Sequence, residues 1–162
     1  MNGTSMLWHY TFGQNFQKIV AEKAIKPSNA YLGTDAPAVV WFSRNQIWDS
    51  AATKSLVSDD GTVQNLTMEE LRQHGGGLYR IGVAHETAPH NWDAFVQKSG
   101  ISHDMAVELR RIAKRNGASL KEWFVSFDPV EQSKWLAVEL MDNHKWINAI
   151  QGPATSFNVQ AT

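Results

Sequence analysis

"LWHYTFGQ", residues 7–14, begins like a buried β-strand and then presents three polar side chains in succession. Leu7 and Trp8 are large and apolar, whereas His9, Tyr10 and Thr11 carry an imidazole, a phenol and a hydroxyl group. A polar group in a protein interior costs free energy unless it finds a hydrogen-bond partner. The stretch therefore predicts a strand whose polar groups are either satisfied by the backbone or turned toward a ligand.

The segments around this first strand have the pattern of a mixed domain. Phe16, Ile19 and Val20 recur at helical spacing, and residues 37–44 form an apolar, β-branched run typical of a buried strand. Residues 45–61 are polar and irregular. The other expected elements are helices at 68–74, 91–100 and 102–117 and strands at 78–85, 122–127, 134–141 and 146–150. Strands at both ends and helices between them predict an α+β fold with a largely antiparallel sheet and peripheral helices.

Composition narrows the class of protein. The 162 residues are 43% hydrophobic and 19% charged, which predicts a single domain over residues 1–162, with a loose tail at 151–162. A formal net charge of -1 provides no overall basic field for nucleic acid. The absence of cysteine excludes disulfides, a thiolate nucleophile and thiolate zinc ligands. No signal peptide and no apolar run of about 18 residues is evident, so we expect a cytoplasmic protein without a membrane span.

Two motifs that resemble ligand sites have structural explanations. The glycines at 75–77 follow a predicted helix and lack the lysine of a P-loop, so we interpret them as a helix stop or hinge. In "HETAPH", residues 85–90, the histidines are five positions apart and Pro89 interrupts any helix. This spacing does not fit a helical zinc motif, so we expect a turn and no metal site.

The helix expected at 102–117 carries a basic side. A solvated helix face is the ordinary explanation of such a pattern. If the protein acts on a nucleic acid or an acidic protein, this side is the first candidate contact. It consists of Arg110, Arg111, Lys114 and Arg115.

"WLAVEL", residues 135–140, places a carboxylate within an apolar strand. Alternation predicts Trp135, Ala137 and Glu139 on one face. Glutamate is depleted in strands, so Glu139 is expected at a rim, in an ion pair or in a cleft. In a cleft, an ionised carboxylate stabilises developing positive charge, as in an oxocarbenium-like transition state. Glu131, in the preceding loop, is the competing carboxylate.

Three of these features, in this order, resemble the ADP-ribosyltransferase superfamily, in the branch that includes diphtheria toxin and the poly-ADP-ribose polymerases. They are His9-Tyr10-Thr11, the strand and small residues of "VVWFSRNQIWDSAATK" at 39–54, and the late Glu139. Members of this branch carry a histidine on the first strand, an aromatic-rich strand that leads into a Ser/Ala-rich segment, and a late glutamate. This chain departs from the pattern where Trp41 replaces the usual tyrosine and where Tyr-Thr, rather than Gly-Thr, follows the histidine.

The resemblance implies a split sheet and an enzyme that cleaves the nicotinamide–ribose bond of NAD and transfers ADP-ribose to a macromolecular acceptor, or to water as an NAD glycohydrolase. Such an enzyme would be an intracellular toxin, a defence factor or a phage-encoded modifier. His9 would hydrogen-bond the nicotinamide ribose, the backbone around Tyr10 would pair with the nicotinamide amide, and Glu139 would stabilise the oxocarbenium ion. The other residues implied in NAD binding are Thr11, Trp41, Phe42, Ser43 and Ser50.

The alternative is a non-enzymatic binding domain, such as an inhibitor, that uses an aromatic-rich surface against a protein partner. A protein interface shows exposed aromatic anchors, whereas an enzyme lines a concave pocket with them. A core built from large rings is the ordinary explanation of many tryptophans. The seven in this chain are Trp8, Trp41, Trp48, Trp92, Trp123, Trp135 and Trp146.

Overall fold

The computed structural model describes residues 5–28, 37–49, 55–57, 63–65 and 67–149. Over these residues the chain is an α+β fold built on a seven-stranded sheet, in the order β11-β10-β6-β1-β3-β8-β7, and each neighbouring pair is antiparallel. The expected α+β class with a largely antiparallel sheet is confirmed. The strands are β1 (Leu7–Phe12), β3 (Val40–Ser43), β6 (Leu78–Val83), β7 (His90–Asn91), β8 (Trp123–Ser126), β10 (Trp135–Asp142) and β11 (Lys145–Asn148).

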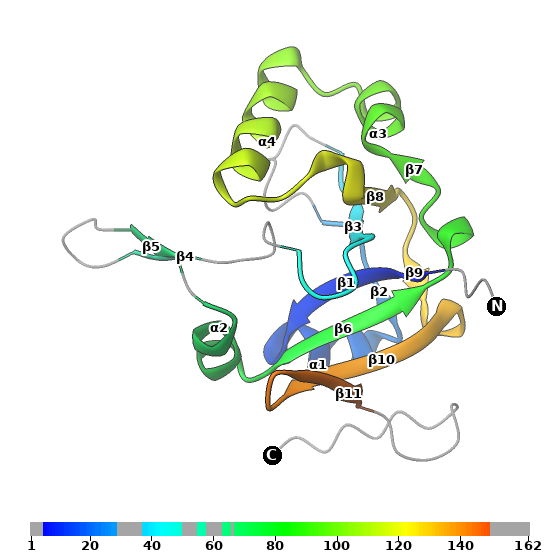
Figure 1. Ribbon diagram of the computed structural model, residues 1–162. Helices are drawn as coiled ribbons and strands as arrows, with labels where there is room; N and C mark the ends of the chain where they lie inside the picture. The colour runs from blue at the N-terminus through cyan, green and yellow to red at the C-terminus, as the bar shows by residue number, and fades with distance from the viewer. Residues whose placement is uncertain (1–4, 29–36, 50–54, 58–62, 66, 150–162) are drawn as a thin grey trace.

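The sheet is weakly joined in its middle, between β1 and β3 (Figure 1). Strand β1 pairs with β6 along its whole length. In contrast, the ladder between β1 and β3 has one pair of residues in the part of the chain that the structure describes, Trp8 opposite Ser43. We call this junction the seam. It divides the sheet into a four-stranded half, β11-β10-β6-β1, and a three-stranded half, β3-β8-β7.

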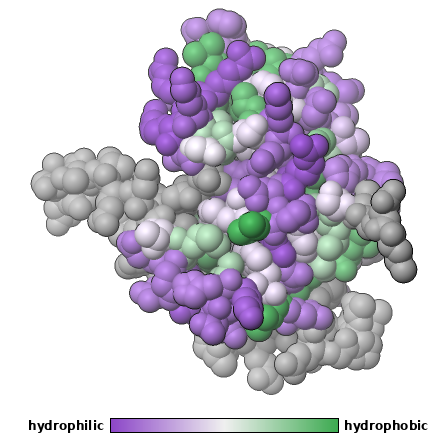
Figure 2. Space-filling model, viewed as in Figure 1, coloured by the Kyte–Doolittle hydropathy of each residue, from purple (hydrophilic) through white to green (hydrophobic). Residues whose placement is uncertain are grey.

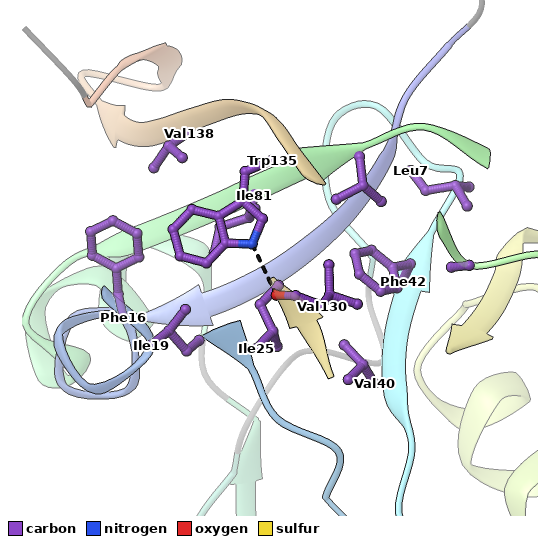
Figure 3. Close-up of a cluster of buried hydrophobic side chains, with 12 residues drawn as sticks. Leu7, Phe16, Ile19, Ile25, Val40, Phe42, Ile81, Val130, Trp135 and Val138 are labelled. Carbon is purple, nitrogen blue, oxygen red and sulfur yellow. Dashed lines mark hydrogen bonds between the residues drawn. The ribbon is translucent and has the colours of Figure 1, made fainter. Parts of the chain in front are cut away.

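Helix α1 (Gly13–Glu22) follows β1 directly and packs with a small sheet of β2 (Ala24–Ile25) and β9 (Val130–Glu131) against one face of the four-stranded half. Phe16 and Ile19 are buried, as their helical spacing predicts. Figure 3 shows side chains of these elements meeting those of β3 in one core. Its buried members are Leu7, Phe16, Ile19, Ile25, Val40, Phe42, Ile81, Val83, Ala88, Val130, Trp135 and Val138.

Helices α3 (Trp92–Ser99) and α4 (His103–Arg115) pack on the three-stranded half and form a second core with it. Side chains at the N-caps accept hydrogen bonds from backbone amides in the first turn of each helix. Asn91 accepts from the Ala94 amide, and Ser102 accepts from the Met105 amide. The outer side of α4 is hydrophilic (Figure 2). The buried members of this core are Val39, Trp92, Phe95, Ala106, Leu109, Ala113, Trp123 and Val125.

The remaining described elements are a helix, a hairpin and three short 3-10 turns. Helix α2 (Met68–Gly75) begins at Thr67, whose hydroxyl oxygen accepts from the Glu70 amide, which caps the first turn of the helix. Strands β4 (Ser55–Val57) and β5 (Val63–Asn65) form a hairpin that projects from the body (Figure 1). The prediction of irregular chain over residues 45–61 is wrong for β4, and no element was predicted at β5. Short 3-10 turns cover His85–Thr87, Leu120–Glu122 and Gln132–Lys134, and the first agrees with the turn predicted for "HETAPH".

The predicted alternation along β10 is wrong at Trp135. The register against β6 shifts between Trp135 and Ala137, which is the signature of a bulge. Trp135 consequently belongs to the same core as Val138, and its indole N–H donates to the Val130 carbonyl at 3.2 Å (Figure 3). A bulge adds one residue to a strand and turns the side chains that precede it to the other face. Glu139 lies beyond the bulge and follows the expected alternation with Ala137.

Candidate functional site

A cavity of about 700 Å³ opens beside the seam, where β1 and β3 separate. This volume is within the range of pockets that bind small molecules, about 300–1,000 Å³. Six of the seven residues expected to bind a cofactor line it, and they are His9, Tyr10, Thr11, Trp41, Phe42 and Ser43. The seventh, Ser50, lies outside the described residues. Two segments that are some 30 residues apart in the sequence therefore contribute to one cavity.

The cavity has an apolar interior and a charged mouth. Exposed Lys18 and Lys26 line it together with Glu22, and Glu22 forms an ion pair of 3.6 Å with Lys26. A cavity with an apolar interior and lysines at its mouth fits a ligand that has a planar or apolar part and an anionic part. The apolar lining residues include Ile19, Ile25, Val39, Val40, Leu109 and Ile112.

His9 presents a lone pair rather than a positive charge. Burial lowers the pKa of His9 below its ordinary value of 6.5, against the opposing effect of a hydrogen bond to the Trp41 backbone. The Nδ1 atom lies 2.8 Å from the Trp41 carbonyl oxygen, which can only accept, so the neutral ring carries its proton on Nδ1. No described residue offers a hydrogen bond to Nε2. This nitrogen is an acceptor on a ring that lines the cavity.

The lowered pKa of His9 predicts a pH-dependent contribution to stability. The unfolded chain takes up a proton on His9 as the pH falls through 6.5, whereas the folded chain resists that protonation. The contribution of His9 to the free energy of unfolding is therefore full above pH 6.5 and is lost as the pH falls toward the lower folded pKa. We expect the stability difference between wild type and His9→Asn, measured by urea unfolding, to favour wild type more at pH 8 than at pH 5. A difference that does not change with pH would contradict the buried, neutral imidazole.

Ser43 is held by a buried carboxylate. Its hydroxyl donates to Asp49 Oδ2 at 2.6 Å, and the indole N–H of Trp123 donates to the same oxygen at 3.0 Å. Asp49 and Ser43 are only 5% and 4% exposed. The Ser43 hydroxyl proton is thus committed to Asp49, which limits Ser43 to shaping the wall of the cavity. Sequence reasoning missed Asp49.

Tyr10 and Trp41 also have internal partners. The Tyr10 hydroxyl donates to the Asn45 carbonyl at 2.6 Å, and burial, ahead of opposing effects of Arg80, raises the pKa of Tyr10 to about 12. The phenol stays protonated at neutral pH. The Trp41 ring packs edge-on against Phe95 in the second core. Both side chains therefore line the cavity with part of their surface while they hold the fold together.

The structure does not bring Glu139 together with His9. Glu139 is level with Arg80 on β6, and Arg80 is level with Tyr10 on β1. Side chains that are level in a ladder share a face, and successive residues of a strand point to opposite faces. His9 therefore lies on the opposite face from Glu139, which is not among the residues that line the cavity.

Glu139 forms an ion pair with Arg80 and does not line the cavity. Its Oε2 atom lies 2.6 Å from Nη2 and 2.8 Å from Nε of Arg80. The Arg80 side chain is 9% exposed and that of Glu139 is 23% exposed. Of the three positions expected for Glu139, the paired one is observed. Sequence reasoning missed Arg80, although an arginine in the apolar strand "LYRIGV" is as unusual as a glutamate in "WLAVEL".

The other sequence candidates lie elsewhere. Glu131 is exposed on β9. Arg111 forms a surface ion pair of 3.0 Å with Glu108. All four basic residues of α4, namely Arg110, Arg111, Lys114 and Arg115, are exposed, as predicted for a solvated helix face. In the described part of the chain, no cluster of three or more histidine, aspartate or glutamate side chains is arranged to hold a metal ion. None of the helices described is both long and apolar enough to cross a membrane.

Comparisons with models of known families, with curated proteins and with solved structures found no match for this chain.

Proposed function

We propose that the protein binds NAD in the cavity beside the seam, cleaves its nicotinamide–ribose bond and transfers ADP-ribose to a macromolecular acceptor, in an ADP-ribosyltransferase-like fold. One observation carries this proposal. The residues that the sequence resemblance implies in NAD binding, taken from β1 and from β3, line a single cavity of suitable volume.

The chemistry of the cavity supports a bound dinucleotide. The Nε2 atom of a neutral His9 can accept a hydrogen bond from a ribose hydroxyl. Lys18 and Lys26 at the mouth favour a ligand with a diphosphate group. The apolar interior favours a flat ring such as nicotinamide or adenine.

In this proposal, the carboxylate that stabilises the oxocarbenium ion is a cavity residue, because Glu139 is paired with Arg80 and does not line the cavity. Two carboxylates line the cavity, Glu22 and Asp49. Asp49 is buried and accepts two hydrogen bonds, from Ser43 and Trp123, whereas Glu22 forms only a surface ion pair of 3.6 Å with Lys26, so Glu22 is the better candidate for this charge.

The basic side of α4 supports an anionic acceptor. Leu109 and Ile112 of α4 line the cavity, and the exposed basic residues occupy the same turns of that helix. A nucleic acid or an acidic protein bound along α4 would therefore lie next to the cavity. The contacts in this proposal are Arg110, Arg111, Lys114 and Arg115.

Titration of the wild-type chain with NAD tests the proposal. A ligand that binds the native state raises the melting temperature, by an amount that grows with its concentration. We expect heat of binding, a higher melting temperature in millimolar NAD, and release of nicotinamide that increases when RNA, DNA or an acidic protein is added. The absence of both heat and a melting shift in millimolar NAD would reject NAD as the ligand.

A non-enzymatic binding role has one specific observation in its favour. Ile47 is 72% exposed, and its backbone is fixed because the Trp146 indole N–H donates to the Ile47 carbonyl at 2.8 Å. A large apolar side chain that is exposed on a fixed backbone is available for contact with a protein partner. If NAD neither binds nor is cleaved, Ile47 is the first residue to change in a search for a protein partner.

A further inference from the structure

Arg80 lies at the centre of an unusual set of contacts. Its guanidinium carbon lies 3.8 Å from the ring centroid of Trp8 and 4.5 Å from that of Trp146, so the group contacts two indole rings. Two of its nitrogens contact Glu139 Oε2, and the third, Nη1, donates to the backbone carbonyl of Gln46. Every nitrogen of the guanidinium group is therefore used.

The neighbours of Arg80 bind the same segment, which runs from residue 45 to residue 49 and follows β3. The Tyr10 hydroxyl donates to the Asn45 carbonyl at 2.6 Å, and the Trp8 indole N–H donates to Gln46 Oε1 at 2.8 Å. The Trp146 indole N–H donates to the Ile47 carbonyl at 2.8 Å. All of these donors, Arg80 included, belong to the four-stranded half.

The far end of the segment is tied to the three-stranded half. Asp49 accepts from Ser43 on β3 and from Trp123 at the start of β8. Residues 45–49 thus cross the seam, with one end bonded to each half of the sheet. We call them the strap. Because the ladder between β1 and β3 has a single described pair, Trp8 opposite Ser43, the strap is the main polar connection across the seam.

We propose that Arg80 is a positioning residue that holds the strap against the four-stranded half, and that Glu139 acts through Arg80 by orienting its guanidinium group. Asp49, at the end of the strap, and its partner Ser43 on β3 both line the cavity, so the position of the strap sets one wall of it. That this wall contacts NAD rests on the proposed function. The proposal that Arg80 holds the strap is independent of the proposed function.

Arg80→Lys is the most informative variant. Lysine keeps the positive charge, so it preserves the ion pair with Glu139 and avoids an unpaired buried carboxylate. However, an ammonium group cannot lie flat against two indole rings while it bonds both Glu139 and the Gln46 carbonyl. Arg72→Lys on α2 is the matched control, because the ion pair of Arg72 with Glu69 at 2.6 Å is also short but lies at the surface, with side chains 39% and 42% exposed.

Hydrogen exchange measured by NMR on wild type, Arg80→Lys and Arg72→Lys tests the strap. In Arg80→Lys we expect exchange on the order of tenfold faster at the indole N–H groups of Trp8 and Trp146 and at the amides of Ile47 and Trp48, the change expected from losing one charge-assisted hydrogen bond. The indole N–H of Trp135, which bonds the Val130 carbonyl in the core, should not change. Equal exchange at the strap in Arg80→Lys and wild type, or faster exchange at Trp135 as well, would overturn the proposal.

The dissociation constant of NAD separates this proposal from the proposed function. If wild type binds NAD, we expect Arg80→Lys to bind about tenfold more weakly and Arg72→Lys to bind as wild type does. Unchanged affinity in Arg80→Lys would show that the strap does not set the wall, and would overturn that step. If wild type does not bind NAD but the strap loosens as expected, the proposed function fails while Arg80 keeps its positioning role.

Discussion

Replacing His9 by asparagine is expected to lower the rate of nicotinamide release from NAD on the order of 100-fold, while the chain stays folded. The side-chain amide of asparagine can still donate to the Trp41 carbonyl, so the bond of 2.8 Å that now holds the ring has a substitute. The acceptor at Nε2 is lost. A ribose hydroxyl that is no longer oriented leaves the reactive geometry, and a small misplacement of this kind costs about 100-fold in rate.

His103→Asn is the control for this variant. His103 is exposed at the start of α4 and does not line the cavity beside the seam. Nicotinamide release should be the same in His103→Asn and wild type when it is measured by chromatography at saturating NAD. If His9→Asn also retains the wild-type rate, His9 is a strand histidine satisfied by the backbone, which is the other interpretation of "LWHYTFGQ".

The elements of the fold were predictable where local sequence decides them. The apolar run "VVWFS" forms β3 within its expected range, and Thr67 caps α2 because an N-cap hydroxyl accepts from an amide in the first turn of its own helix. The hairpin β4-β5 was missed, since its two strands are three residues each. A strand that short has no periodicity to detect.

The grouping of the candidate site residues was less predictable, because it depends on register. His9 is level with Ile81 and Val138, whereas Glu139 is level with Arg80, one position further along. A shift of one residue in register moves a side chain to the other face of a sheet. The bulge after Trp135 shifts the register once more, and no local sequence pattern predicts it. Motif order along the chain therefore placed His9 in the cavity correctly but could not decide the face of Glu139.

The pair Arg80–Glu139 illustrates how a charge in a strand is explained by its partner. The two residues are 59 positions apart in the sequence, so nothing local connects them. Each was unusual by itself, and two unusual charges of opposite sign on different apolar strands favour an ion pair across a sheet. This rule would have indicated the pair from the sequence, with β6 and β10 as neighbours.

Phe16→Ala is expected to lower the free energy of unfolding by about 3–5 kcal/mol, the usual cost of removing a buried phenylalanine. Phe16 is 0% exposed, and its ring stacks on Tyr79 with 4.1 Å between centroids and 6° between planes. Because α1 follows β1 without a loop, the helix has little freedom to move inward and fill the space. A domain of this size typically has a stability of about 5–15 kcal/mol, so the loss is a large fraction of the total.

Gln17→Ala provides the matched comparison, since Gln17 is the exposed neighbour on the same helix and alanine is a good helix former. Its free energy of unfolding should stay within about 0.5 kcal/mol of wild type. Urea unfolding of the three proteins measures both values. A small loss in Phe16→Ala would mean that α1 does not seal the core beneath β1 and β6. Ile19 and Ile25 line the cavity and belong to the same core as Phe16. A small loss would therefore also mean that packing around Phe16 does not support this wall of the cavity.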